Sequence, residues 1–290
     1  MTEQPQRNRV NDVKGCSQYN RPFSSGRDCH APQVIPERQQ ATALKISESL
    51  KIATWNVRTM LQKGKLDNIK REMGRLKINI MGISEVRWKG AGVINSDSHK
   101  LIYSGGNDHE RGVGFILDRQ TSLSLEGYWA VSDRVILIKL EGKPLDLDII
   151  QIYAPTSTST EEDIDTFYLD LEKAKKQCKS QDPVIIMGDF NAKVEQRMDD
   201  VVGLDGLGQK NERGERLVEW AQRNEVIIGN TWFEQPPRRK WTWKSPGDGS
   251  RNQIHFILVS KRFRNALLIS KTLPSADCYK DHVLLMGKLE

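Results

Sequence analysis

The chain has 290 residues, of which 37% are hydrophobic and 28% charged, with a formal net charge of +6. This length and apolar content suffice for one large domain with a sizeable core, and no apolar run approaches the roughly 18 residues of a membrane helix. The four cysteines are scattered and include no Cys-x-x-Cys pair, which argues against a disulfide framework and against a structural zinc site.

The N-terminus begins Met-Thr-Glu-Gln-Pro-Gln and lacks an apolar signal segment. We therefore expect a soluble intracellular protein, nuclear or cytoplasmic, that acts as a monomer and without a membrane. The positive balance favours a polyanionic partner such as nucleic acid, although a basic surface without a binding function is also compatible with so modest an excess.

Residues 1–49 form a polar segment rich in Gln, Arg, Ser, Pro and Asn, with sparse and aperiodic apolar residues. Such a segment cannot bury enough surface to offset the entropy lost on ordering, so we predict that it is disordered. Residues 50–290 contain no internal linker and no short repeat, and they are predicted to form one domain.

The domain is predicted to begin with a strand at 50–56, a helix whose apolar residues recur at helical spacing from Leu66, and a strand at 78–84. A polar residue closes each strand, Asn56 the first and Glu85 the second. Open sheets place their chemistry at such strand ends, which makes both residues candidates for a functional site.

The remaining elements follow from apolar runs and from helical periodicity. We predict strands at 100–104, 113–117, 135–140, 147–153 and 184–187, helices at about 161–178 and 212–223, and strands at 226–230, 253–259 and 283–289. Many strands with few helices indicate two sheets packed face to face, with the helices outside.

The stretch Pro183–Lys193 organises the chain. Its strand ends at Gly188, which permits a sharp turn. Asp189 and Asn191 follow two positions apart, so in extended backbone their side chains share one side. Such a pair can polarise a water molecule and hold a phosphate oxygen beside it, although a strand that ends in an Asx turn shows the same pattern.

Six short motifs occur in one order along residues 50–290. They are Thr54-Trp-Asn56, Ile83-Ser-Glu-Val86, Tyr153-Ala-Pro155, Gly188-Asp-Phe-Asn191, Arg251-Asn-Gln-Ile254 and Asp281-His282. With them the chain resembles the endonuclease/exonuclease/phosphatase family, in particular the apurinic-type endonuclease domain of non-LTR retrotransposons and the craniofacial development protein 2-like proteins. The resemblance implies an α/β fold, a four-layered α/β sandwich of two packed, mainly antiparallel sheets flanked by helices. It also implies DNA as the partner and Mg²⁺-dependent phosphodiester hydrolysis that nicks one strand, with Mn²⁺ as an alternative metal.

The resemblance also implies a role for each polar residue. Glu85 would bind Mg²⁺, a hard cation that takes oxygen ligands, and Asp189 would position or deprotonate the attacking water. Asn56 and Asn191 would hold phosphate oxygens or orient that carboxylate. The predicted catalytic residues are Asn56, Glu85, Tyr153, Asp189, Asn191, His255, Asp281 and His282, and the predicted metal ligands are Glu85 and Asp281. Tyr153 would donate to a phosphate oxygen, and His282 would stabilise the charge on the phosphorane.

His255 departs from the family pattern, in which an Asp accepts a hydrogen bond from the catalytic His282 and stabilises its protonated form. A neutral imidazole can accept one hydrogen bond but supplies no negative charge, and a second imidazole nearby disfavours protonation of either ring. We therefore keep a second interpretation, a catalytically impaired nucleic-acid-binding descendant of the enzyme. A smaller departure is Lys280, where the family usually has Ser.

Basic and aromatic residues flank the predicted site, and they suit phosphate contacts and base stacking. The predicted DNA-binding residues are Arg58, Arg87, Lys89, Asn211, Arg239, Lys240 and Trp241, with Lys63, Lys65, Arg238 and Trp88 as further candidates. For Asn211 an Asx turn is an equal alternative, and for Trp243 and Phe256 core packing is favoured. A third interpretation, a phosphatase or phospholipase of the same fold acting on inositol or sphingolipid phosphates, is disfavoured by the Arg251–Ile254 motif and by the basic loops.

Overall fold

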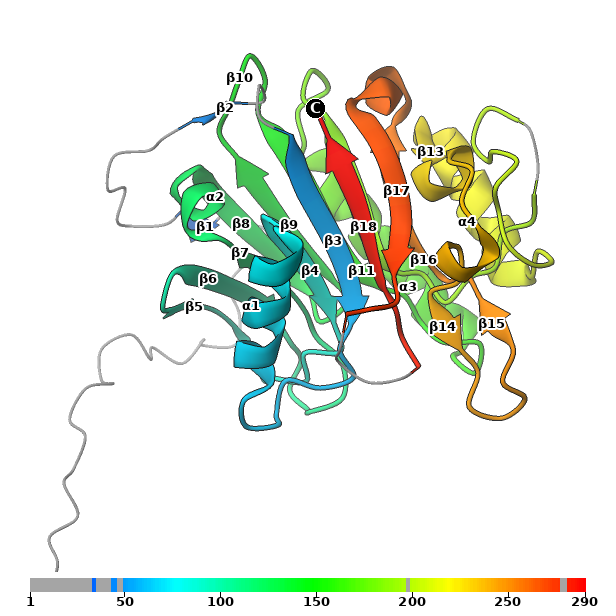
Figure 1. Ribbon diagram of the computed structural model, residues 1–290, viewed down its shortest axis with the longest axis horizontal. Helices are drawn as coiled ribbons and strands as arrows, with labels where there is room; N and C mark the ends of the chain where they lie inside the picture. The colour runs from blue at the N-terminus through cyan, green and yellow to red at the C-terminus, as the bar shows by residue number, and fades with distance from the viewer. Residues whose placement is uncertain (1–32, 35–42, 46–48, 197–198, 277–280) are drawn as a thin grey trace, which may run out of the picture.

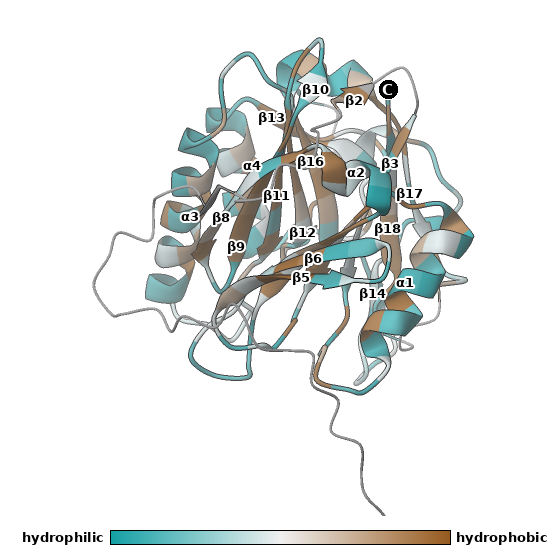
Figure 2. Ribbon diagram, turned by 90° about the vertical axis from the view of Figure 1, so that its left-hand side faces the viewer, coloured by the Kyte–Doolittle hydropathy of each residue, from teal (hydrophilic) through white to brown (hydrophobic). Residues whose placement is uncertain are grey.

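The computed structural model describes residues 33–34, 43–45, 49–196, 199–276 and 281–290. Within these ranges the chain forms two seven-stranded sheets that pack face to face (Figure 1). A view at right angles shows helices α3 and α4 on one side of the sandwich and helix α1 on the other, with hydrophobic strands between them (Figure 2). The predicted four-layered α/β sandwich is confirmed.

Each seven-stranded sheet is antiparallel apart from one parallel pair. The first sheet has the order β1 (Gln33–Val34), β8 (Leu125–Ser132), β9 (Val135–Leu140), β11 (Leu147–Tyr153), β12 (Val184–Asp189), β16 (His255–Ser260) and β13 (Val226–Ile228). The second has the order β17 (Leu267–Leu273), β18 (Leu284–Leu289), β3 (Leu50–Asn56), β4 (Ile80–Ser84), β7 (Val113–Leu117), β6 (His99–Ser104) and β5 (Ala91–Ser96). The parallel pairs are β11 with β12 and β3 with β4.

The helices form where amphipathic segments carry good N-terminal caps. Helix α3 (Glu161–Lys176) begins after Thr160, whose hydroxyl accepts a hydrogen bond from the backbone N–H of Asp163. Helix α4 (Glu212–Arg223) is capped by its preceding residue in the same way. Such caps satisfy N–H groups that have no partner within the helix. The other helices are α1 (Lys65–Leu76), the short α2 (Arg119–Leu123) and the 3-10 turns η1 (Gly229–Trp232), η2 (Pro237–Arg239) and η3 (Lys261–Ala266). Two short pairs complete the structure, β2 (Leu44–Lys45) with β10 (Gly142–Lys143) and β14 (Trp243–Lys244) with β15 (Arg251–Asn252).

Three apolar clusters hold the layers together. The central cluster lies between the sheets and joins side chains such as Ile52 and Phe115 of the second sheet to Ile149 and Met187 of the first. The other two clusters bury helices α3 and α4 against the first sheet and helix α1 against the second. Burial of apolar surface is the main favourable term in folding, so these clusters fix how the layers stack.

Eight of the described strands were not predicted from the sequence: the longer β5, β8 and β17, and the two-residue strands β1, β2, β10, β14 and β15. Strands β5 and β17 are edges of the second sheet, where one side of the strand faces solvent. Their sequences therefore mix apolar and polar residues without the long apolar runs of the central strands. The predicted strand at 226–230 ends at Ile228, because the backbone turns into η1 at Gly229.

Most of the predicted disordered segment, residues 1–49, lies outside the described residues. Two described pieces of it form strands, which differs from the prediction for these residues. Strand β1 pairs with β8, and β2 pairs with β10. None of the helices in the described ranges is long and apolar enough to cross a membrane.

One buried carboxyl group lies away from the sheet end that carries the site residues. Asp148, in β11, is fully buried, and the Nζ atom of Lys139 lies 3.5 Å from its Oδ1. Burial raises the pKa of Asp148 to about 6, although Lys139 opposes the rise. The folded protein therefore holds this proton at pH values where the unfolded chain has released it.

The free energy of unfolding should consequently fall as the pH rises between about 4 and 6, because over this window the native state binds more protons than the unfolded state. A shift of about two pKa units corresponds to roughly 3 kcal/mol. Urea unfolding at pH 4, 5, 6 and 7 should show this drift in the difference between wild type and the Asp148→Asn variant. The exposed Asp108→Asn control should track wild type. Parallel curves for wild type and Asp148→Asn would contradict the prediction.

Candidate active site

The predicted catalytic residues gather at one end of the sandwich, toward which the β3 arrow points in Figure 1. Strands β3 and β4 end there in the second sheet, and their parallel alignment brings Asn56 level with Ser84, one residue before Glu85. Strands β11 and β12 end there in the first sheet. Strands β16 and β18 begin there, because they run antiparallel to β12 and β3.

The side chain of Asn56 connects the two sheets. Its Nδ2 donates to Glu85 Oε1 and to Asp189 Oδ2, both at 2.9 Å, and its Oδ1 accepts from the backbone N–H of Arg58. Carboxylates only accept hydrogen bonds, so the amide nitrogen has to face both of them. Asn56 is 2% exposed, and it therefore sets the position of both carboxylates from a buried point.

Glu85 follows β4 with a backbone φ of 59°, in the left-handed region that is costly for residues other than glycine. Its Oε2 accepts from the Arg87 guanidinium at 2.7 Å and its Oε1 from the Tyr153 hydroxyl at 3.3 Å. Burial, followed by the neighbouring Glu85 carboxylate, raises the pKa of Tyr153 well above its usual value. The phenol therefore stays protonated at neutral pH and remains a hydrogen-bond donor.

Asp189 is 2% exposed and accepts from the backbone N–H of Asn191 at 3.1 Å. Its Oδ2 lies 3.5 Å from His255 Nε2. Burial alone would raise the pKa of Asp189, but His255, His282 and the Asn56 amide together outweigh burial and lower it. The carboxylate is thus held ionised and can accept a proton or a hydrogen bond. The Asn191 carboxamide donates to the backbone oxygen of Ala154 and so is fixed beside it.

The two imidazoles of the site face each other. His255 Nε2 lies 3.1 Å from His282 Nδ1, with the ring planes 3° apart. Burial, and then the adjacent His255, lowers the pKa of His282 to about 4, so this ring is neutral at pH 7. The Nδ1 atom of His255 is buried and finds no hydrogen-bond partner among the described residues.

One proton therefore serves the contact between the rings. If His255 Nε2–H donates to His282 Nδ1, the outer Nε2 of His282 keeps its own proton and His255 is left with an unpaired acceptor. The opposite arrangement would leave an unpaired N–H in the core, and buried donors are seldom left unpaired. Asp281 lies on the outer side, where its Oδ2 is 4.0 Å from His282 Nε2 and 3.2 Å from the Arg58 guanidinium.

Two donor sets could hold a metal ion. Glu85 offers carboxylate oxygens, which fit the hard, oxygen-preferring Mg²⁺. The second set combines one carboxylate oxygen of Asp189 with ring nitrogens of His255 and His282, all within 4.8 Å of one another, and nitrogen donors suit transition metals better. Asp281, predicted as a ligand, instead forms an ion pair with Arg58; its role at a metal stays a prediction.

The predicted DNA-binding residues next to the site differ in how far they are exposed and in whether another residue already binds them. Lys89 is exposed, whereas Arg87 is bound to the Glu85 carboxylate. The suggestion that Lys65 reaches phosphate is wrong, because it is buried at 4% exposure at the start of α1. Asn211 caps helix α4, and its Oδ1 accepts from the N–H groups of Gly214 and Lys193. This bears out the local alternative, and contact with substrate stays a prediction.

The second basic cluster lies near η2. Arg238 is exposed and Arg239 half-buried, whereas Lys240 pairs with Asp205 at 2.7 Å. Trp241 is half-buried with a guanidinium stacked 5.1 Å from its ring centre. Phe256 is fully buried and Trp243 packs beside the His282 ring, so both pack as expected. Lys280 lies outside the described residues.

Two supporting residues were not found from the sequence. The hydroxyl of Thr242 accepts from the backbone N–H groups of Ile254 and His255, which fixes the start of β16. Arg134 places its guanidinium 5.5 Å from the Tyr153 ring centre and donates to the Tyr153 backbone oxygen. Both come from segments without a motif, and only their tertiary position shows their role.

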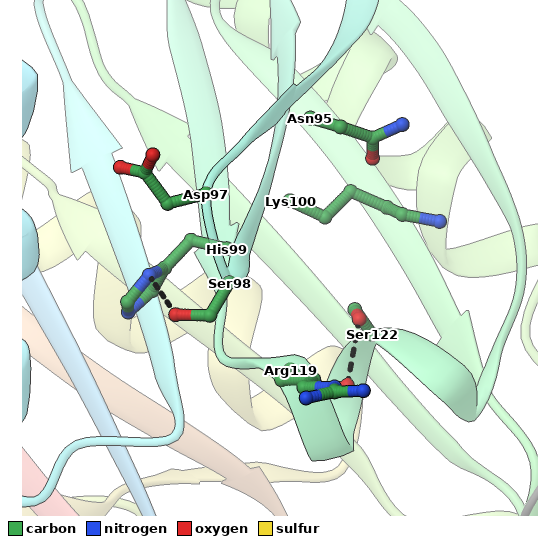
Figure 3. Close-up of a pocket in the computed structure, with 7 residues that line it drawn as sticks. All are labelled: Asn95, Asp97, Ser98, His99, Lys100, Arg119 and Ser122. Carbon is green, nitrogen blue, oxygen red and sulfur yellow. Dashed lines mark hydrogen bonds between the residues drawn. The ribbon is translucent and has the colours of Figure 1, made fainter.

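A separate polar pocket lies at the turn between β5 and β6 and at helix α2 (Figure 3). Its lining comprises Asn95, Asp97, Ser98, His99, Lys100, Arg119 and Ser122. None of these residues was predicted to be a site residue, and none of them belongs to the cluster around Asn56.

Comparison with known proteins agrees with the motifs. A model of the Endonuclease/Exonuclease/phosphatase family matches residues 53–285. Craniofacial development protein 2 from Bos taurus is 43% identical over 239 residues, which cover 82% of this chain and 40% of that protein. The chain thus spans less than half of this relative's length. The predicted resemblance is confirmed.

Solved structures share the fold. The endonuclease domain of TRAS1, a telomere-specific non-LTR retrotransposon, matches with a TM-score of 0.61 and 11% identity over 84% of this chain and 99% of its own. An AP endonuclease from Archaeoglobus fulgidus matches with a TM-score of 0.61 and 18% identity, over 83% of this chain and 99% of its own. At such identities the two matches show the architecture alone.

The Asn56 bridge can be tested by stability. An Asn56→Ala change removes the donor shared by Glu85 and Asp189, and it should lower the free energy of unfolding by roughly 1–3 kcal/mol. Urea unfolding at pH 7 measures this. Asn68→Ala, on the exposed face of α1, is the matched control and should change stability by less than about 0.5 kcal/mol. Equal stability of the two variants would contradict the bridge.

Proposed function

Because the chain belongs to the endonuclease/exonuclease/phosphatase family, we propose that it is a divalent-cation-dependent phosphodiesterase that nicks one strand of DNA. The observation that carries this proposal is the Asn56 bridge, which holds Glu85 of one sheet beside Asp189 of the other. A metal ligand and a base for water then stand side by side, as phosphodiester hydrolysis requires.

Glu85, Asp189 and Tyr153 each have a separate role in the proposed hydrolysis. Mg²⁺, when bound, offsets negative charge on the phosphate and on the departing oxygen, and Glu85 supplies oxygen ligands for it. Asp189, held ionised, orients the attacking water and accepts its proton. The protonated Tyr153 donates a hydrogen bond to a phosphate oxygen. Fixed donors of this kind stabilise the charge that develops in the transition state.

A second interpretation rests on the paired imidazoles. In the predicted mechanism His282 stabilises negative charge best as an imidazolium, yet burial and His255 keep it neutral at pH 7. Its Nε2–H can still donate a hydrogen bond, but a neutral donor is weaker than a charged one. The specific contact of 3.1 Å between the rings therefore favours a slow enzyme, or a nucleic-acid-binding descendant of one.

Restoring a carboxylate at position 255 should raise nicking. We expect His255→Asp to nick supercoiled plasmid with Mg²⁺ faster than wild type, by between about 10-fold and the 10⁴-fold that a serine triad loses without its carboxylate. His255→Asn is the matched control, because Asn has the size of Asp without its charge, and it should not raise the nicking rate above that of wild type.

Equal nicking rates for His255→Asp and His255→Asn would show that a negative charge at position 255 does not control the rate. Two further variants locate the chemistry: Asp189→Ala should abolish nicking, and Glu85→Gln should raise the Mg²⁺ concentration needed for half-maximal rate. Nicking by Asp189→Ala at the wild-type rate would show that the site lies elsewhere. Phosphate release from soluble inositol phosphates, without DNA cleavage, would favour the phosphatase interpretation.

The basic residues near η2 should contribute to DNA affinity through phosphate. Each lost phosphate contact lowers the slope of log affinity against log salt by about 0.9. We expect the Arg238→Ala/Arg239→Ala variant to lose up to about two units of slope in fluorescence anisotropy with a duplex between 50 and 200 mM KCl. Lys240→Ala is the internal control, because Asp205 already pairs with this cation. A larger effect for Lys240→Ala would reverse the assignment.

A further inference from the structure

A buried polar cluster lies between the two sheets, within the largely apolar interface that joins them. It consists of Thr54 on β3, Ser84 on β4 and Gln151 on β11, each at most 1% exposed. We call these three residues the Gln151 cluster. None of them belongs to the motif positions with an assigned role.

Every polar atom of the cluster is used. Gln151 Nε2 donates to Ser84 Oγ at 3.0 Å and to Thr54 Oγ1 at 3.1 Å, while Thr54 Oγ1 lies 3.2 Å from Gln151 Oε1 and donates to it. Ser84 Oγ donates in turn to the backbone oxygen of Ile152 at 3.0 Å. A buried network that is fully satisfied rigidifies the structure around it, because any displacement leaves a polar group unpaired.

The second sheet is shaped to receive the carboxamide. Gly82 pairs with Thr54 across β4 and β3, and a Cβ atom at Gly82 would lie only 1.9 Å from Gln151 Oε1. A side chain at position 82 would therefore exclude the carboxamide from its place. The absence of that side chain lets a long polar residue of the first sheet reach hydroxyls of the second.

The cluster lies directly beneath the site. Thr54 precedes Asn56 by two residues on β3, Gln151 precedes Tyr153 by two on β11, and Ser84 is followed by Glu85. Two residues along a strand return a side chain to the same face, about 6.6 Å further on. The cluster and the site thus form two successive layers of side chains between the same strands.

Because the site residues come from both sheets, the site requires a fixed position of one sheet relative to the other. Apolar contact between sheets is non-directional, so it resists separation more strongly than a small shift of one sheet along the other. Hydrogen bonds are directional, and a single buried polar residue is known to set the register of packed elements in other folds. A shift of about 1 Å at a catalytic group can cost on the order of 100-fold in rate.

We propose that Gln151 is a positioning residue that fixes the two sheets in register, so that Asn56 and Glu85 of one sheet meet Tyr153 and Asp189 of the other. The proposal deepens the phosphodiesterase function above and rests on it. Gln151 touches no reacting atom and acts through the backbone of β11 and through its two hydroxyl partners.

The test separates positioning from stability. Gln151→Met keeps the length of the side chain and removes the carboxamide partner of both hydroxyls, although Ser84 Oγ keeps its bond to the backbone oxygen of Ile152. It should lower the Tm by roughly 5–10 °C and kcat for nicking by about 10- to 100-fold, with KM for DNA within about twofold of the parent. The full 290-residue chain is used, and the parent is whichever of wild type and His255→Asp nicks.

The decisive variant is Thr54→Val/Ser84→Ala/Gln151→Met. Replacing all partners of a buried hydrogen-bond network by apolar groups of similar shape is nearly neutral for stability, so the Tm should return to within about 3 °C of the parent. Because the register is then unspecified, kcat should stay at least about 10-fold low. Thr272→Val, at a buried hydroxyl of β17 in the same sheet, is the matched control and should leave kcat unchanged.

Recovery of both Tm and kcat in the triple variant would overturn the proposal, because the cluster would then serve stability alone. If neither parent nicks DNA, the proposed function fails, and crystal structures of wild type and the triple variant still decide the present inference. Loss or lengthening of the contact between Asn56 Nδ2 and Asp189 Oδ2 would support positioning. An unchanged contact would end it.

Discussion

The candidate site depends on one carboxamide held between two carboxylates that belong to different sheets. Asn56 Nδ2 spans Glu85 and Asp189 with two hydrogen bonds of 2.9 Å, and a buried carboxylate such as Asp189 is costly unless it is paired. The amide therefore stabilises the charge and fixes its place at once. The strained backbone at Glu85 fits this account, since such conformations persist where the surroundings hold them.

The short distances within the site also bring His255 next to His282, and this contact disfavours protonation of His282. His255 lies opposite Asp189 across β12 and β16, and its Nε2 reaches both the Asp189 carboxylate and the His282 ring. This closeness lowers the pKa of Asp189 and so supports the ionised carboxylate, but it also lowers the pKa of His282 and disfavours a proton there. The histidine pair therefore bears on the proposed cleavage chemistry and not on the proposed binding of DNA, which involves other residues.

Apolar packing and buried hydrogen bonds contribute differently to the structure around the site. The apolar cluster between the sheets supplies the driving force for their association, and the Gln151 cluster supplies direction within it. Arg134 and Thr242 fix the ends of β11 and β16 through backbone groups. The site residues are therefore held by buried polar contacts in addition to the hydrogen bonds among themselves.

The sequence by itself determined the central strands, the three long helices and the order of the polar residues that end or begin those strands. It did so because long apolar runs and helical periodicity report burial directly, and because the motifs have fixed offsets from the strands. Edge strands such as β5 and β17 are half-solvated and were not predicted from their pattern. Only the tertiary structure decided which cations are available at the surface: Lys65 is buried, and Lys240 is paired with Asp205. Such pairings join residues far apart in the chain, and neither spacing nor periodicity carries information about them.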